Sequence, residues 1–255
     1  MGKGTALITG ASSGIGVELA KLCAADGYDV VLVARQRAAL EDLAFSLSQA
    51  HGIAARAVIA DLADPAAARA VFDSAGTVDI LINNAGFGLR GAYAGTDWEA
   101  EARMIQVNVT ALAHLTKLYL PGMIARRSGR ILNVASTAAF VPGPFMAMYY
   151  ATKAFVFSFS LAIANELQGT GVTLTVLCPG PTRTNFFETA GSANTNIIKG
   201  PSMSAASVAR EGYDAMMAGK AEIIAGRRNR WMIWGTRFAP RRMLAGIARR
   251  LNSTA

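Results

Sequence analysis

Short apolar runs alternate with segments of helical periodicity along the chain. The apolar runs lack the polar alternation of half-exposed strands, so they predict strands that are covered on both faces, as in a parallel sheet flanked by helices. Right-handed crossovers between such strands give a doubly wound α/β fold. The runs lie at residues 5–10, 29–35, 55–62, 78–86, 130–136, 172–180 and 221–226, which predicts a mostly parallel sheet of seven strands with helices on both faces.

Helical periodicity is longest at residues 97–124 and 149–167. Residues 185–205 are instead rich in Gly, Ser, Asn and Thr, and they predict a mobile loop that acts as a lid over a substrate site. The chain has 255 residues, of which 52% are hydrophobic, enough for one large core. We expect residues 1–226 to form a single Rossmann-type catalytic domain, with residues 227–255 as a C-terminal extension of it.

The net charge of +8 is concentrated in that extension, because residues 227–255 hold eight arginines and no acidic residue. Apolar side chains, among them Trp231, Trp234 and Phe238, are interleaved with the arginines, as in a basic amphipathic helix pair broken at Gly235 and Pro240. We favour packing of this segment against the body or a second subunit. Contact of residues 227–251 with an anionic membrane or an acyl-carrier partner is the alternative. We expect no nucleic-acid binding, since no recognition motif accompanies the basic residues.

Cysteine and histidine usage predicts no metal site and no disulfide. Cys23 and Cys178 lie within apolar runs, as buried thiols do, and His51 and His114 have no ligand-type neighbours at metal-binding spacing. No apolar segment reaches the 18 residues of a membrane span, and the N-terminus runs directly into a strand. We therefore expect a cytoplasmic protein, with peripheral contact to the inner face of the membrane as the alternative.

The first predicted strand ends in a glycine-rich turn that opens at once into a helix. Glycines let the backbone approach a pyrophosphate, and a helix N-terminus presents free N–H groups to it. The strand before and the helix after this turn indicate a dinucleotide site. Its candidate residues are Gly10, Ser12, Ser13, Gly14, Ile15 and Gly16.

Tyr149 and Lys153 are four residues apart in a helical segment, so their side chains share one face of the helix. A nearby ammonium favours the phenolate, and we expect it to lower the pKa of Tyr149 from about 10 towards neutral pH. Such a tyrosine is suited to general acid/base catalysis. The adjacent Tyr150 has Ala154 at the matching position, so only Tyr149 completes the pattern.

These motifs resemble the short-chain dehydrogenase/reductase family, whose marker is the TGxxxGxG turn. Further motifs follow in family order over nearly the whole chain, which makes the resemblance specific. It implies an adenine contact at Asp61-Leu62, cofactor contacts at Asn84, Ala85 and Gly86 of NNAG, and nicotinamide-side contacts at Pro179, Gly180, Thr182 and Thr184.

The resemblance also implies a catalytic tetrad of Asn108, Ser136, Tyr149 and Lys153. In this scheme Ser136 hydrogen-bonds the substrate oxygen, with Thr137 as second choice, and Tyr149 gives that oxygen a proton. Lys153 also holds the nicotinamide ribose, and Asn108 anchors a water that links Lys153 to solvent.

The end of the second strand predicts the cofactor. An acidic residue there would accept a hydrogen bond from the ribose of NAD and repel a 2′-phosphate. Here Ala34 stands at the position where NAD-preferring relatives carry Asp, and Arg35 follows with a guanidinium suited to a phosphate. Arg37 is a further candidate for that contact. We therefore predict NADP(H).

The predicted reaction is the interconversion of a carbonyl (ketone, aldehyde or 3-oxoacyl group) and an alcohol. Residues 87–96 and 140–148, which flank the motifs, are mostly apolar or small and favour a small hydrophobic substrate. We expect a homo-oligomer, either a dimer or a tetramer. The alternative functions are a nucleotide-sensing regulator and a membrane-associated protein of the same fold, each with little turnover.

Overall fold

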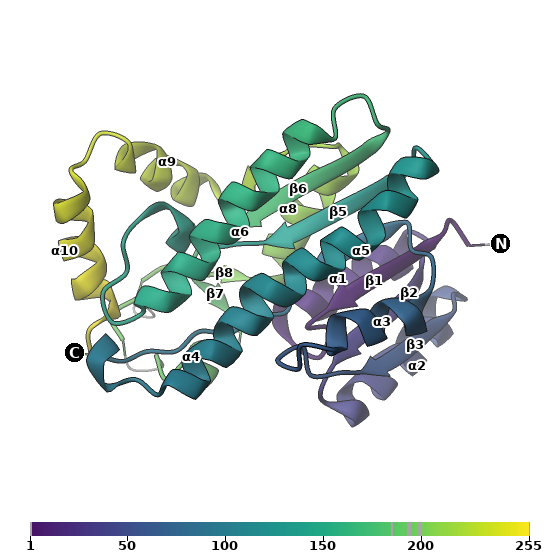
Figure 1. Ribbon diagram of the computed structural model, residues 1–255, viewed down its shortest axis with the longest axis horizontal. Helices are drawn as coiled ribbons and strands as arrows, with labels where there is room; N and C mark the ends of the chain where they lie inside the picture. Colours follow the sequence, from purple (N-terminus) through teal and green to yellow (C-terminus); the bar gives the residue numbers. More distant parts are fainter. Residues whose placement is uncertain (1, 185, 193–194, 198–199, 255) are drawn as a thin grey trace.

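A single seven-stranded sheet forms the centre of the computed structural model, which describes residues 2–184, 186–192, 195–197 and 200–254 (Figure 1). All neighbouring strands in this sheet are parallel, which confirms the predicted α/β fold and all seven predicted strands. In spatial order the strands are β3 (Ala55–Ile59), β2 (Asp29–Ala34), β1 (Thr5–Thr9), β4 (Ile80–Asn83), β5 (Gly129–Val134), β6 (Val172–Cys178) and β9 (Glu222–Ile224).

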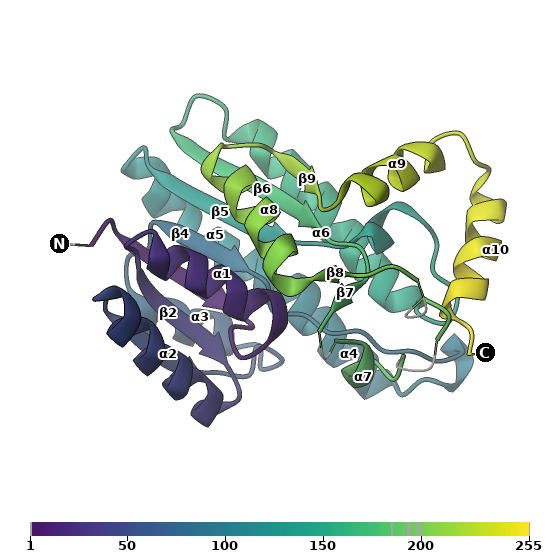
Figure 2. The same cartoon turned by 180° about the vertical axis from the view of Figure 1, so that it is seen from behind.

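Side chains on both faces of the central strands are fully buried, because helices cover both faces. Leu7 and Leu81 point into one core and Ile8 and Leu32 into the other, and each such side chain stabilises the fold by about 1.5–3 kcal/mol. Figures 1 and 2 show the two helical layers. One layer holds α1 (Gly14–Ala25), α2 (Arg37–His51) and α8 (Ala205–Met217), and the other holds α3 (Ala67–Ala75), α5 (Leu112–Ala125) and α6 (Ala147–Glu166).

Helix α6 is the one described helix that is long and apolar enough to cross a membrane by length and composition alone. The expectation from the sequence was that no segment would reach that length. In the fold, α6 packs along β6, as the core helix of a globular domain does.

The helix expected over residues 97–124 is continuous but not uniform. Asp97 caps its first turn by accepting a hydrogen bond from the Ala100 amide, and α4 (Trp98–Ile105) follows. A π-helical segment, Gln106–Ala111, then leads into α5. Single π turns inside α-helices are often found at functional sites, and this one contains Asn108.

The segment predicted to be a structureless lid, residues 185–205, lies in part outside the described residues. Its described portion includes α7 (Phe186–Thr189) and the strand β8 (Met203–Ser204). Strand β8 pairs in parallel with β7 (Thr182–Arg183), so the two ends of the segment lie side by side. Short 3-10 turns occur at Tyr93–Gly95 and Thr137–Phe140.

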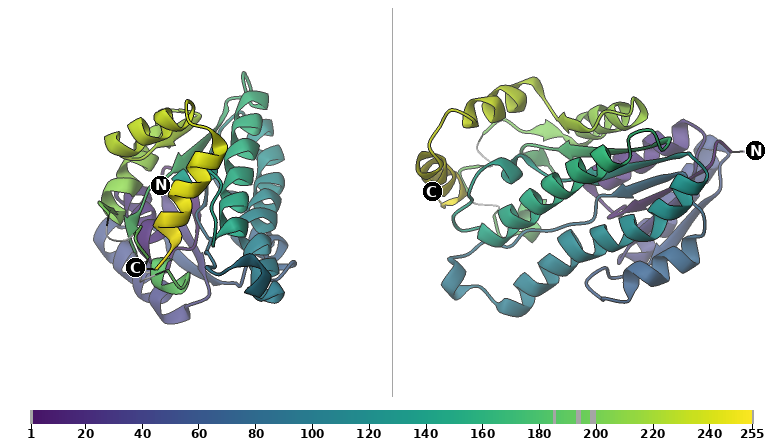
Figure 3. Two further views of the ribbon diagram at one scale, coloured as in Figure 1. Left: turned by 90° about the vertical axis from the view of Figure 1, so that its left-hand side faces the viewer. Right: turned by 45° about the horizontal axis from the view of Figure 1, so that its top comes forward.

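The C-terminal extension forms two helices, α9 (Arg227–Thr236) and α10 (Arg241–Asn252). Pro240 directly precedes α10, as predicted, whereas Gly235 lies within the last turn of α9. Figure 3 shows both helices extending beyond the carboxyl end of the sheet, with α10 passing across the front of the molecule in the left view. We call residues 227–252, which comprise both helices and the linker between them, the C-terminal arm.

Candidate active site

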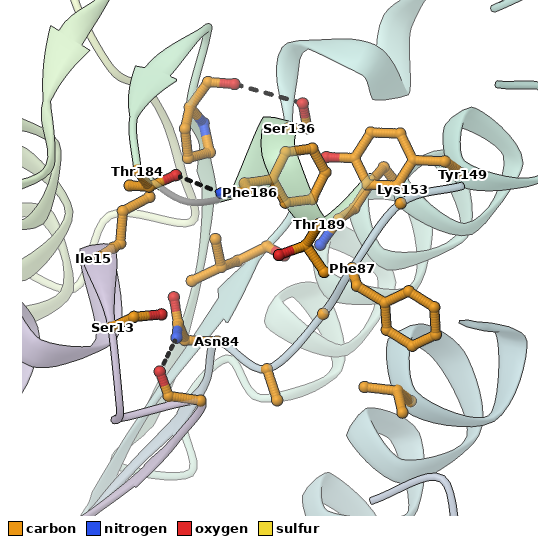
Figure 4. Close-up of a pocket in the computed structure, with 18 of the residues that line it drawn as sticks. Ser13, Ile15, Asn84, Phe87, Ser136, Tyr149, Lys153, Thr184, Phe186 and Thr189 are labelled. Carbon is orange, nitrogen blue, oxygen red and sulfur yellow. Dashed lines mark hydrogen bonds between the residues drawn. The ribbon is translucent and has the colours of Figure 1, made fainter. Parts of the chain in front are cut away.

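The carboxyl ends of the parallel strands meet at one edge of the sheet, where they line a cavity of about 540 Å³ (Figure 4). The strand order reverses between β1 and β4, and ligands of doubly wound sheets bind beside such a reversal. The cavity brings together all the predicted site residues except Gly16 and Asn108: Gly10, Ser12, Ser13, Gly14, Ile15, Arg35, Asp61, Leu62, Asn84, Ala85, Gly86, Ser136, Tyr149, Lys153, Pro179, Gly180, Thr182 and Thr184.

The glycine-rich turn crosses the floor of this cavity in a backbone conformation that requires glycine. Gly10 and Gly14 have φ of +66° and +56°. A Cβ on Gly10 would lie 2.8 Å from the Asn84 amide nitrogen, which itself donates to the Thr9 carbonyl at 2.9 Å. Gly16 has another role, since it lies against the Gly10 carbonyl and lets α1 start close to the turn.

The N-terminus of α1 opens into the same cavity. Ser13 precedes the helix, and its side chain makes no capping hydrogen bond. The first amides of a helix have no partner within it, and they carry positive partial charge. This end of the cavity is therefore suited to an anionic group such as a pyrophosphate.

A charged cluster lines the cavity beyond β2 and β3. Asp61 lies 3.0 Å from Arg103 and 4.0 Å from Arg35. Burial opposes ionisation of Asp61, but hydrogen bonds from the Ala63 amide and Arg103 outweigh it and hold the carboxyl pKa below its usual value. Arg37 instead pairs with Glu41 at 3.1 Å, outside the cavity lining.

Arg103 was missed by the sequence analysis. It comes from α4, 42 residues after Asp61, and no local pattern connects the two positions. Gln36 was missed in the same way, although it directly follows Arg35. Its side-chain oxygen accepts a hydrogen bond from the Ser12 hydroxyl at 2.8 Å, which links the end of β2 to the glycine-rich turn.

Tyr149 and Ser136 lie together on the other side of the cavity, from α6 and the end of β5 (Figure 4). Burial raises the pKa of Tyr149, and a hydrogen bond with the Ser136 hydroxyl opposes this only in part. The expected fall of the Tyr149 pKa towards neutral was therefore wrong, because the cost of burying the phenolate dominates. The spacing of the residues indicates their proximity but not the cost of burying a charge.

Lys153 is itself buried, and burial lowers its pKa to about 8. Its ammonium donates a hydrogen bond to the Val134 carbonyl at 2.8 Å and lies 5.9 Å from the centre of the Tyr149 ring. One bond to a strand-end carbonyl therefore positions this side chain beneath the tyrosine.

Asn108 lies just behind the cavity, in the π-helical segment. Its side chain accepts from the Phe87 amide at 3.1 Å and donates to the Phe87 carbonyl at 2.9 Å. It also donates to the hydroxyl of Thr152, a buried residue that the sequence analysis missed, at 3.1 Å. A Cβ on Gly86 would lie 3.0 Å from the Asn108 carbonyl oxygen and 3.3 Å from the Lys153 ammonium, so glycine there keeps these two groups close.

Apolar side chains form the outer wall of the cavity next to Tyr149. Phe87 and Met146 come from the two stretches that the sequence analysis associated with the substrate. Phe186, from the described part of the predicted lid, has its ring 5.2 Å from that of Tyr149. The space beside the tyrosine is thus suited to an apolar molecule.

Cys23 and Cys178 lie away from this lining. Both are buried free thiols, and burial raises the pKa of each. Within the described ranges, no group of three His, Cys, Asp or Glu side chains could hold a metal ion.

Similar proteins share both this fold and this sequence pattern. A serine 3-dehydrogenase of Agrobacterium fabrum is 38% identical over 206 residues, covering 77% of this chain and 81% of its own. A short-chain dehydrogenase of Sphingobium yanoikuyae, solved in complex with NADPH, is 34% identical with a TM-score of 0.83, covering 92% of this chain and 93% of its own.

A short chain dehydrogenase/reductase of Burkholderia phymatum, solved in complex with NAD, is 24% identical and shows likeness of fold, with a TM-score of 0.82 over 98% of this chain and 97% of its own. A sequence model of the family described as short chain dehydrogenase matches residues 4–195 of this chain. From this match and the shared architecture, we conclude that the chain belongs to the short-chain dehydrogenase/reductase family of oxidoreductases, which bind nicotinamide cofactors.

Proposed function

We propose that the protein is an NADP(H)-dependent oxidoreductase that interconverts a hydrophobic carbonyl compound and its alcohol, with Tyr149 as general acid/base. One observation carries this proposal. The Tyr149 hydroxyl, the Ser136 hydroxyl and the Lys153 ammonium lie in the same cavity as the glycine-rich turn, between that turn and an apolar wall.

The side chains have separate roles in the proposed reduction. Ser136 hydrogen-bonds the carbonyl oxygen, and Tyr149, a phenol that is protonated at neutral pH, donates its proton to that oxygen. The cofactor, when bound, supplies a hydride to the carbonyl carbon. Lys153 holds positive charge beneath the phenol below about pH 8 and favours the tyrosinate formed as the proton leaves.

The proposed preference for NADP(H) rests on the end of β2. Arg35 lines the cavity beside the Ser12–Gln36 hydrogen bond, and Arg103 already satisfies Asp61 at the shorter distance. Arg35 is therefore available to a 2′-phosphate, and a guanidinium matches the geometry of that group. The NADPH complex of the Sphingobium relative supports the same assignment.

Screening tests this proposal directly. Ketones, aldehydes and 3-oxoacyl thioesters should be assayed for NADPH oxidation, and we expect turnover with apolar members of at least one class. Titration of NADPH in parallel separates the alternatives. Tight NADPH binding without turnover of any of these compounds would favour the regulatory role over the enzymatic one.

A further inference from the structure

The outer face of α9 carries aromatic side chains that the fold leaves in solvent. Trp231, Trp234 and Phe238 are 70%, 54% and 73% exposed. Trp231 and Trp234 lie three residues apart on one face of α9, and Phe238 follows two residues after the end of the helix. Ile233, which is buried, and Asn229, whose amide donates to the Ala225 carbonyl at 2.7 Å, lie on the opposite face and attach α9 to the body.

These aromatics form an ordered ridge. The rings of Trp231 and Trp234 meet edge to face at 6.0 Å, and those of Trp234 and Phe238 at 5.0 Å. These three side chains therefore do not pack against the body, whereas packing against a second subunit, the other part of the same expectation, stays a prediction. An apolar ridge of this size in solvent indicates an interaction surface.

Helix α10 repeats the pattern. Met243, Ile247 and Leu251 are four residues apart and exposed, while Ala248 and Asn252 are buried. Figure 3 shows α9 and α10, joined by a short linker, at the same end of the molecule, beyond the carboxyl end of the sheet. Each helix of the arm thus has one face attached to the protein and an apolar face without a protein partner among the described residues.

The charge of the arm selects among possible partners. It contains eight arginines and no acidic residue, and within the described part of the chain only Arg230 pairs with a carboxylate, that of Glu211 at 4.0 Å. A second copy docked through a two-fold axis would place this arginine-rich surface against itself, which like-charge repulsion disfavours. The partner is therefore anionic and also accepts tryptophan and phenylalanine.

An anionic lipid surface meets both requirements. Tryptophan is enriched at the level of the headgroups, arginines pair with lipid phosphates, and amphipathic helices of this composition lie in the plane of the interface. We propose that the C-terminal arm docks the protein onto anionic phospholipid membranes, with Trp231, Trp234 and Phe238 inserted at the headgroup level.

Co-sedimentation of the full chain with vesicles tests this proposal. Binding to phosphatidylcholine vesicles that contain phosphatidylglycerol should be clear at low salt and fade as salt rises, and binding to pure phosphatidylcholine should be weaker. Replacing Arg228, Arg241 and Arg242 with Gln should weaken binding by roughly 100-fold, or about fivefold for each arginine. Tryptophan fluorescence should shift to the blue on binding and lose that shift in Trp231→Ser/Trp234→Ser.

A matched control uses exposed aromatics elsewhere on the molecule. Phe45 and Trp98 are 69% and 59% exposed and lie outside the arm, so Phe45→Ser/Trp98→Ser should bind vesicles as the wild type does. Absence of sedimentation at low salt would overturn the proposal. A wild-type oligomer that Trp231→Ser/Trp234→Ser dissociates, without lipid binding, would assign the ridge to a second copy. Retention on a polyanionic protein but not on vesicles would assign it to an acidic protein.

A separate observation concerns the end of α10, where Asn252 is fully buried. Its side chain accepts from the Tyr150 hydroxyl at 3.3 Å and donates to the Pro144 carbonyl at 3.0 Å. Its backbone carbonyl accepts from Arg90 at 2.8 Å. One residue of the arm thereby connects both substrate-side loops with the helix that carries Tyr149.

We infer that Asn252 is a positioning residue that holds the outer wall of the substrate pocket, an inference that rests on the proposed function. Asn252→Ala should raise KM for the carbonyl substrate roughly tenfold and leave kcat and NADPH affinity within a few-fold, because the cofactor turn lies at the other side of the cavity. Ser253→Ala, which removes a neighbouring exposed hydroxyl, is the control.

Hydrogen exchange provides a readout that needs no substrate. The Gly91 amide bonds the Phe145 carbonyl, and the Met146 amide bonds that of Gly143. Both amides should exchange faster in Asn252→Ala, whereas amides of β1 and β4 should not change. Unchanged exchange at Gly91 and Met146, or an unchanged KM in an active wild-type background, would overturn the inference. If both amides exchange faster in Asn252→Ala but the wild type reduces no carbonyl, the result counts against the proposed function and not against this inference.

Discussion

The Tyr149 hydroxyl is buried, and burial raises the pKa of a phenol that is protonated at neutral pH even in water. A protonated phenol is what the proposed reduction requires of its proton donor. Lys153 lies beneath it and loses its own proton near pH 8. Between them, the two groups place a proton donor and a positive charge next to the apolar wall.

Tyr149→Phe should lower kcat by about 10²–10⁴-fold, the usual contribution of a general acid, while NADPH affinity is unchanged. The substitution removes one hydroxyl and leaves the glycine-rich turn intact. Steady-state kinetics and fluorescence titration of NADPH measure the two effects. Tyr150→Phe is the control and should keep kcat within a few-fold, and a wild-type kcat in Tyr149→Phe would exclude the proposed acid.

The rate of carbonyl reduction should depend on pH through Lys153. We expect kcat/KM to be flat below about pH 8 and to fall above it, as the lysine loses the charge that favours tyrosinate. In Lys153→Arg the guanidinium stays charged, so any remaining activity should extend to higher pH. If kcat/KM still falls near pH 8 in this variant, a group other than Lys153 causes the fall.

The burial of Lys153 also makes the free energy of unfolding depend on pH. Folding lowers the Lys153 pKa from 10.5 to about 8, so the unfolded chain binds the additional proton between those two pH values. The unfavourable contribution of this lysine to stability is therefore complete below pH 8 and shrinks as the pH rises through that window.

Cofactor choice should change with Arg35. Arg35→Asp places a carboxylate beside the 2′-position, and we expect the ratio of kcat/KM for NADPH over NADH to fall by roughly 10–100-fold, as for loss of one hydrogen bond to a charged group. Arg37→Asp is a matched control, because Arg37 pairs with Glu41 outside the cavity lining. If only the Arg37 variant shifts the ratio, that residue binds the phosphate.

At the scale of elements, the sequence predicts best the strands that are buried on both faces, because burial makes each of them a uniform apolar run. The seven strands are readable because each is a run of apolar residues without alternation. The π-helical segment could not be predicted from the sequence, since its six residues do not disturb the apolar periodicity on either side. Asn108 was nevertheless identified from its motif, whereas its partner Thr152 has no motif and required the packing of α6 against that segment.

The segment between β7 and β8 should respond to ligands. The described residues Phe186 and Ile197 line the cavity, so NADPH and substrate bound together should slow hydrogen exchange of amides from Phe186 to Ser192. The amides of α2, none of which belongs to a residue that lines the cavity, are a control. Equal exchange with and without both ligands would indicate a fixed wall.

At the scale of the whole molecule, one cluster connects distant parts of the chain. The Tyr213 hydroxyl donates to Asp26 at 3.0 Å, and Asp26 also pairs with Lys3 at 2.9 Å. This cluster joins the N-terminus and α1 to α8, 187 residues along the chain. Sequence patterns place each residue in its element but do not indicate that these elements meet.

Tyr213→Phe should lower the free energy of unfolding by about 1 kcal/mol, the usual contribution of one hydrogen bond. The hydrogen bond with Lys3 opposes burial and, with that from Tyr213, lowers the Asp26 pKa, so this stability is present above the unfolded carboxyl pKa and is lost as the pH falls through the folded value. Chemical denaturation at neutral and acid pH measures the difference. Tyr93→Phe, at an exposed site, should cause no change.

The pairing of β7 with β8 has a consequence for how the substrate range of this protein can diverge. The registers Thr182↔Met203 and Arg183↔Ser204 hold the two ends of the intervening segment at a fixed spacing, apart from the central sheet. Loop-closure entropy grows slowly with length, so residues inserted or deleted between these ends should cost the fold little free energy. Because Phe186 of this segment borders Tyr149, exchanging the segment between relatives should change the apolar wall beside that residue, and with it the proposed substrate preference, while the glycine-rich turn stays in place.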